Sequence, residues 1–109
     1  MPFDEQLANR IRKIMMRRRG IAERKMFGGL CFTANGHMCC GITGQDLMVR
    51  IGPEKHAEAL LQPHVREMDF TGRPLKGYIY VDPAGYQSDD SLKNWIKAGL
   101  QFVSSLPPK

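Results

Sequence analysis

The amino-acid sequence predicts an α+β fold: an antiparallel β-sheet of about five to six strands with N-terminal, middle and C-terminal helices packed against it. The pair Asn35-Gly36 lies between two short apolar segments, and this pair favours the two-residue turn of a β-hairpin because both residues tolerate positive φ. Further β-prone segments follow with short turns between them, as in an antiparallel meander. The alternation of strands and helices that a parallel sheet needs is absent from the sequence.

Length and composition favour one domain, residues 1–109, with a core of its own. Apolar residues make up 42% and charged residues 25% of the chain, which are ordinary globular values. No apolar stretch approaches the ~20 residues that span a bilayer. The first residues include acids and form no apolar signal core. Three cysteines in such a chain are typical of reduced cytosolic thiols, so we expect a cytoplasmic protein without a membrane partner.

The first half of the chain predicts one helix and four strands. The helix covers residues 4–19, with Asp4 as its N-cap and Gly20 just beyond its end. Its apolar stripe consists of Leu7, Ile11, Ile14 and Met15. The strands are predicted over residues 23–27, 29–34, 37–42 and 47–51.

The second half predicts two helices separated by extended segments. A helix opens at Gly52-Pro53-Glu54 and ends at Pro63, with Ala57, Leu60 and Leu61 facing inward. We expect residues 65–70 to be extended, 71–77 to form a loop and 78–81 to form a strand. The last helix is predicted over residues 90–105. Asp89, Asp90 and Ser91 are its candidate N-cap residues. Its predicted apolar face consists of Leu92, Trp95, Ile96, Leu100 (or Gly99) and Val103.

The cysteines lie around the predicted hairpin. A regular two-residue turn places Cys31 opposite Cys40 on one face of the sheet, where a redox pair is one interpretation. Cys39 and His37 then point to the opposite face, which separates the ligands that a zinc site needs. Buried thiols that act as small apolar groups are the default interpretation, and we expect no metal.

Positive charge is concentrated at the N-terminus. Residues 1–25 contain eight Lys or Arg and three acidic residues, whereas the rest of the chain is balanced. One hypothesis is therefore weak, sequence-independent binding of nucleic acid by Arg17, Arg18, Arg19, Arg24 and Lys25. The alternative is a solvated helix end whose arginines interact with the helix dipole.

The segment 71–77 suggests a second candidate site. Arg73 and Lys76 flank Pro74 between two glycines, and such a loop could hold a small anion. The alternative is a structural loop that positions the following strand. The segment lacks the GxxxxGK[ST] pattern of nucleotide hydrolases.

Catalytic patterns are absent from the sequence. Asp69, Asp82, Asp89 and Asp90 follow no spacing that requires a pair, and no Ser-His-Asp or Cys-His arrangement stands out. His56 and His64 are expected to be exposed, and packing explains Tyr78 and Tyr80 on one strand face. We therefore expect no enzymatic activity, no catalytic residue and no cofactor.

Several segments together resemble one family. Lys25-Met26-Phe27-Gly28-Gly29 resembles the opening strand motif of the TfoX N-terminal domain, which occurs in bacterial competence regulators. Further segments resemble later parts of that domain, namely Asn35-Gly36-His37-Met38, residues 47–53 and residues 68–81. The resemblance implies a stand-alone α+β domain with a link to regulation of DNA uptake and transcription. It implies no catalytic residues.

The sequence thus leaves three hypotheses. The first is a non-enzymatic regulatory domain that contacts a protein partner or a second copy of itself. The second is nucleic-acid binding through the basic N-terminal helix. The third is a small anionic-ligand pocket at Arg73 and Lys76.

Overall fold

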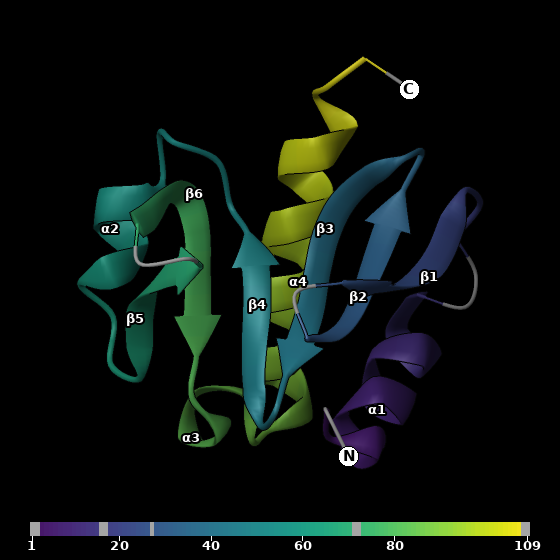
Figure 1. Ribbon diagram of the computed structural model, residues 1–109, viewed down its shortest axis with the longest axis horizontal. Coiled ribbons are helices and arrows are strands. Elements are labelled where there is room, and N and C mark those ends of the chain that lie inside the picture. Colours follow the sequence, from purple (N-terminus) through teal and green to yellow (C-terminus); the bar gives the residue numbers. More distant parts are fainter. Residues whose placement is uncertain (1–2, 16–17, 27, 71–72, 108–109) are drawn as a thin grey trace.

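One antiparallel sheet organises the chain. The computed structural model describes residues 3–15, 18–26, 28–70 and 73–107, and gives the backbone alone for 26, 69–70 and 73–75. Within these residues the sheet has six strands in the order β1-β2-β3-β4-β6-β5 (Figure 1). The strands are β1 (Ile21–Met26), β2 (Gly29–Ala34), β3 (His37–Thr43), β4 (Asp46–Arg50), β5 (Val65–Phe70) and β6 (Arg73–Val81). The predicted α+β class is confirmed.

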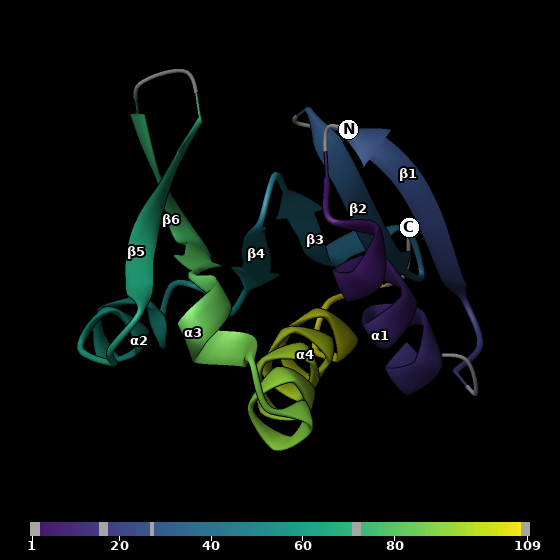
Figure 2. The same ribbon diagram turned by 90° about the horizontal axis from the view of Figure 1, so that it is seen from below.

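The helices lie on one side of this sheet (Figure 2). We call this the helix side, and the opposite face the open side. The described helices are α1 (Glu5–Met15), α2 (His56–Leu60), α3 (Pro83–Tyr86) and α4 (Asp89–Ser104). Helix α4 runs behind the central strands, and α1 lies next to β1 and β2 (Figure 1). The predicted N-terminal, middle and C-terminal helices are therefore all present.

The main core lies between the sheet and the helices. Alternate strand residues point to the helix side, and helical residues at spacings of three and four meet them. Burial of this apolar surface is the main favourable contribution to folding, at roughly 25 cal/mol per Å². Among the residues buried here are Leu7, Ile11 and Met15 of α1, Phe32, Ile42, Leu47, Val49, Ile79 and Val81 of the sheet, and Leu92, Ile96, Leu100 and Val103 of α4.

A second apolar cluster lies on the open side. It consists of Cys31, Met38, Met48 and Met68, and Tyr78 and Tyr80 pack against it. Met48 lies between two β4 residues of the main core, so its side chain points to the other face. The packing interpretation of the two tyrosines is confirmed. The central strands are consequently buried on both faces.

The hairpin turn forms as predicted, but its register differs. Asn35 and Gly36 have φ of 53° and 87°, as a type I′ turn requires. A bulge then shifts the pairing, so that Phe32 faces Cys40 and Cys31 faces Gly41. The predicted pairing of Cys31 with Cys40 is therefore wrong. The additional residue is Cys39.

The bulged strand is in close contact with α4 at Gly99. A Cβ atom added to Gly99 would lie 2.7 Å from the carbonyl oxygen of Cys39. We expect Gly99→Ala to lower the free energy of unfolding by about 1–3 kcal/mol, because helix or strand must move apart. Urea denaturation measures this change. Lys97→Ala on the exposed side of α4 is the control and should change stability by no more than about 0.5 kcal/mol; equal effects would contradict the close-packing account.

The first helix is shorter than predicted. The side chain of Asp4 accepts hydrogen bonds from the backbone N–H groups of Gln6 and Leu7, at 2.9 and 3.2 Å, which confirms its capping role. The helix ends at Met15 instead of residue 19, and β1 begins at Ile21, two residues before the predicted start. Residues 16–17 lie outside the described residues, and residues 18–20 are not helical.

The middle helix is also shorter, and this changes its exposed face. It begins at His56 instead of Pro53 and ends at Leu60. Ala59 is buried, Ala57 is exposed, and Leu61 is 86% exposed. The expectation that Ala57 and Leu61 face inward was wrong because five helical residues bury only one narrow stripe.

The segment after β5 forms a strand instead of a loop. β6 begins at Arg73 and pairs with β5 through Phe70–Arg73 and Asp69–Pro74, so residues 73–77 of the predicted loop belong to a strand. Residues 71–72 lie outside the described residues. The isolated sequence of 73–77 favours a turn, but pairing with β5 provides hydrogen-bond partners that local propensity does not include.

The short helix α3 was not predicted, and α4 begins differently. Pro83 occupies the first turn of α3, a position where its missing N–H is tolerated. Ser88, instead of Asp89, Asp90 or Ser91, caps α4: its hydroxyl oxygen accepts a hydrogen bond from the backbone N–H of Ser91 at 3.1 Å. Asp89 and Asp90 occupy the first turn, where negative charge is favourable.

Candidate functional site

The three thiols are buried and divided between the two faces of the sheet. Cys31 belongs to the cluster on the open side, and Cys39 and Cys40 belong to the main core. Burial raises the pKa of Cys31 to about 11. A hydrogen bond with Cys39, followed by burial, raises the pKa of Cys40. Cys31 and Cys40 therefore stay protonated at neutral pH and are poor nucleophiles.

We expect the native protein to react with Ellman's reagent far more slowly than the unfolded protein. The three thiols are buried, so the reagent reaches them only when the fold opens. The measurement is a time course of thiol titration with and without denaturant. Rapid reaction of any thiol under native conditions would contradict this.

The basic residues near the N-terminus do not form one patch. Arg18 and Arg19 are exposed in the turn before β1. Arg24 pairs with Cys31 and points to the open side, whereas Lys25 pairs with Leu30 and points to the helix side. Arg17 lies outside the described residues. Strand alternation thus separates residues that are adjacent in the sequence, and their contact with nucleic acid stays a prediction.

The anion site predicted at residues 71–77 loses its loop geometry. Lys76 is exposed on β6. The backbone of Arg73 is part of the same strand, and its side chain lies outside the described residues. Binding of an anion by this pair stays a prediction.

His37 connects the hairpin to the C-terminal segment. Its ring is buried, and its Nε2 lies 2.5 Å from the carbonyl oxygen of Pro107. His64 is exposed as expected. His56 is half-buried instead of exposed, and its Nε2 has no hydrogen-bond partner among the described residues.

The carboxylates form ion pairs with arginines. Arg66 lies 2.8 Å from Asp46 and 2.9 Å from Asp82, and these hydrogen bonds raise the pKa of Arg66. Arg10 lies 3.3 Å from Asp89. Asp82 and Asp89 therefore have structural partners. The sequence did not predict these pairs because they join segments far apart in the chain.

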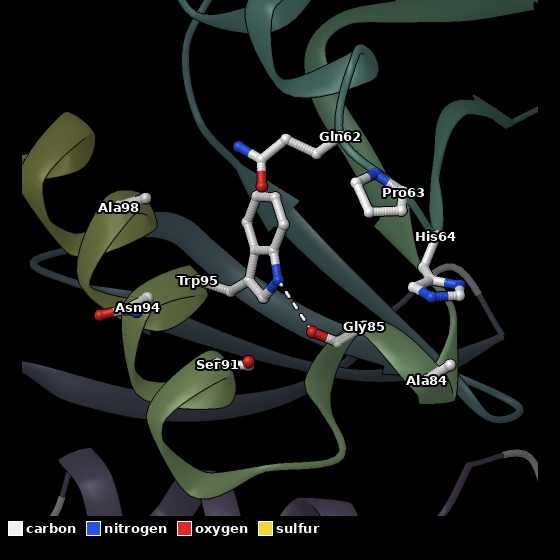
Figure 3. Close-up of a pocket in the computed structure, with 9 residues that line it drawn as sticks. All are labelled: Gln62, Pro63, His64, Ala84, Gly85, Ser91, Asn94, Trp95 and Ala98. Carbon is white, nitrogen blue, oxygen red and sulfur yellow. Dashed lines mark hydrogen bonds between the residues drawn. The ribbon is translucent and has the colours of Figure 1, made fainter.

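A groove runs between α2 and α4 on the helix side. Its largest part is a cavity of about 380 Å³ lined by Trp95 and Ala98 of α4, by His64 and by residues of α3 (Figure 3). The indole N–H of Trp95 donates a hydrogen bond to the carbonyl oxygen of Gly85 at 3.2 Å, which fixes the ring. Two smaller cavities, of about 80 and 260 Å³, continue the groove to Phe102. We call this surface the α2–α4 groove.

The α4 side of this groove is one helix face. Ser91, Trp95, Ala98, Phe102 and Ser105 follow at spacings of three and four, so they lie in one row. The row is about 21 Å long at 1.5 Å per residue. Trp95, Ala98 and Phe102 are only half-buried, which leaves apolar surface open to a partner.

A family comparison identifies the chain. The model of the TfoX N-terminal domain matches residues 13–103, which is most of the sequence. This chain belongs to the TfoX N-terminal domain family. It is therefore a domain of the competence-regulator type, as the motifs predicted. No curated protein matches the chain.

The TfoX domain match extends from the end of α1 to the end of α4, so it includes the whole sheet and the α2–α4 groove. Over the described residues, no helix is long and apolar enough to cross a membrane. Within the same residues no three His, Cys, Asp or Glu side chains are grouped as metal ligands.

The groove residues were not recognised in the sequence as a site. The sequence pattern places Trp95 on the core face of the last helix and indicates no role for Phe102. One signal was available: Trp95, Ala98 and Phe102 follow at helical spacing on the flank of the main apolar stripe. The opposite wall comes from α2 and α3, whose positions local sequence does not specify.

Proposed function

We propose that this TfoX domain is a non-enzymatic regulatory module, acting as one unit over residues 1–109, that binds another protein through the α2–α4 groove. The observation that carries the proposal is the row of half-buried apolar side chains on α4, facing a continuous groove. A soluble partner would bury this surface and gain apolar contact.

The groove is already formed without a partner. The hydrogen bond to Gly85 holds the ring of Trp95, and the guanidinium carbon of Arg50 lies 5.3 Å from the centre of the Phe102 ring. Aromatic groups that are fixed before binding lose little conformational entropy when a partner arrives. Ala98 lies between them in the row and leaves space for an incoming side chain.

The shape indicates the chemistry of the partner segment. A groove with apolar side chains at helical spacing along one wall can accept an amphipathic helix whose own apolar side chains recur at i, i+3 or i+4 and i+7. The rings of Trp95 and Phe102 on its α4 wall favour leucine, methionine or phenylalanine at those positions. We therefore assign the groove to a helical segment of a regulatory partner protein.

The test is selection of binding segments from a displayed library of protein fragments, followed by affinity measurements. We expect Phe102→Ala and Ala98→Gln to weaken the selected segments by more than about tenfold, since each removes or blocks central apolar contact. Glu5→Gln, on the exposed side of α1 and outside both grooves, is the matched control and should change affinity by less than about twofold.

The opposite outcome has a definite meaning. Selected segments that bind both groove variants as tightly as the original chain would reject the groove as the binding site. Light scattering tests the alternative occupant, a second copy of the chain. A dimer that Ala98→Gln converts to a monomer would assign the groove to self-association and reject the partner segment.

A further inference from the structure

A second groove lies between α1 and α4 and is strongly basic. It is a cavity of about 270 Å³ lined by Arg10, Lys13 and Ile14 of α1 and by Asp89 and Lys93 of α4. Three cations and one carboxylate thus surround a common space. We propose that this α1–α4 groove binds phosphate groups of a nucleic-acid backbone, a function beyond the protein binding proposed above.

Arg10 is fixed in a way that suits an anion. Its Nη2 donates hydrogen bonds to the carbonyl oxygens of Tyr86 and Gln87, at 3.1 and 3.0 Å, and to Asp89 at 3.3 Å. The guanidinium carbon also lies 5.9 Å from the centre of the Tyr86 ring. All these contacts use one nitrogen, and Nε and Nη1 have no hydrogen bond among the described residues. A fixed arginine with two remaining donor nitrogens is suited to bind an oxyanion.

The two lysines supply the rest of the charge. Lys13 follows Arg10 by three residues and therefore lies on the same side of α1. Lys93 follows Asp89 by four residues and approaches the groove from α4. Both are exposed. Ammonium groups on both walls can approach one phosphate from opposite sides.

The charge continues beyond the groove, which favours a polymer over a small anion. Lys97 lies one turn after Lys93 on α4 and is exposed. Arg18 and Arg19 are exposed just beyond the end of α1. Phosphates repeat along a nucleic acid, so a backbone seated in the groove can reach these cations as well, whereas a single phosphate cannot.

The site is separate from the α2–α4 groove. Asp89, Lys93 and Lys97 lie on one flank of α4, and Trp95, Ala98 and Phe102 lie on another. The basic groove also contains none of the cations suggested from the sequence, namely Arg17, Arg18, Arg19, Arg24 and Lys25. Variants of the two surfaces can therefore be tested independently.

The experiment is fluorescence anisotropy of a labelled DNA duplex titrated with the full chain over a series of salt concentrations. We expect Lys13→Gln/Lys93→Gln to weaken binding by more than about tenfold at low salt. It should also reduce the log–log salt slope by about two, because two phosphate contacts are lost. The control, Lys55→Gln/Arg66→Gln, removes the same charge at exposed positions outside the basic groove and outside the candidate anion and nucleic-acid sites, and it should keep the slope.

Three results would overturn the proposal. The first is that the original chain does not bind the duplex at low salt. The second is that both double variants lose the same DNA affinity, which would show that binding depends on net charge alone. The third is saturable binding of inorganic phosphate, seen by NMR at Lys13 and Lys93, without binding of the duplex. That result would make the groove a small-anion site.

Discussion

Replacing Phe32 with alanine is expected to lower the free energy of unfolding by about 3–5 kcal/mol, the largest effect of the substitutions considered. Phe32 is among the largest fully buried side chains of the described residues, with 1% exposure. It lies in β2 and contributes to the main core beneath α1. Its removal loses apolar contact and leaves a cavity that the neighbouring strands cannot fill completely.

Phe102→Ala provides the matched control for this prediction. The substitution is chemically the same, but Phe102 is only half-buried at the α2–α4 groove. Its stability cost should therefore be clearly smaller, while its effect on partner binding is large. Urea denaturation of both variants measures the difference. A Phe102→Ala cost equal to that of Phe32→Ala would place this ring in the core and remove it from the binding surface.

Alkaline pH is expected to destabilise the protein through Cys31. Burial raises the pKa of this thiol from 9.0 to about 11, so the native state keeps its proton over a range where the unfolded state loses it. The native state then binds more protons, and the free energy of unfolding falls as pH rises. The contribution of the protonated Cys31 thiol to the free energy of unfolding is complete below pH 9 and is lost as pH rises towards 11. Two pKa units correspond to about 2.7 kcal/mol.

The comparison with Cys31→Ala isolates this contribution. Cys40 and Tyr86 also have raised pKa values, because of the hydrogen bond with Cys39 and of burial respectively, and both groups remain in the Cys31→Ala protein with effects of the same sign. Unfolding free energies measured from pH 8 to 11 should therefore fall less steeply in Cys31→Ala than in the original chain. Identical pH dependence of the two proteins would contradict the buried, protonated state of Cys31.

Local signals in the sequence were sufficient for much of the fold. The turn at Asn35-Gly36 forms because these two residues themselves tolerate positive φ. The strand predicted over residues 65–70 and the last helix also agree with β5 and α4. In each case the residues that specify the element lie within it.

Errors arose where distant segments determine the structure. The bulge at Cys39 lies against Gly99 of α4, about sixty residues further along the chain, so the hairpin sequence alone does not predict it. Strand β6 begins early because β5 pairs with it. The binding grooves depend in the same way on the docking of α4 against α1 and α2, which no single motif specifies.

The most direct test of the proposed function uses Trp95, the single tryptophan of the chain. Its ring lines the α2–α4 groove, so its fluorescence responds to a segment bound there. Titration with a selected helical segment that contains no tryptophan should shift the emission of Trp95 and saturate at the dissociation constant measured independently. Saturable binding of the segment with unchanged Trp95 emission would contradict the assignment of the groove as the protein-binding site.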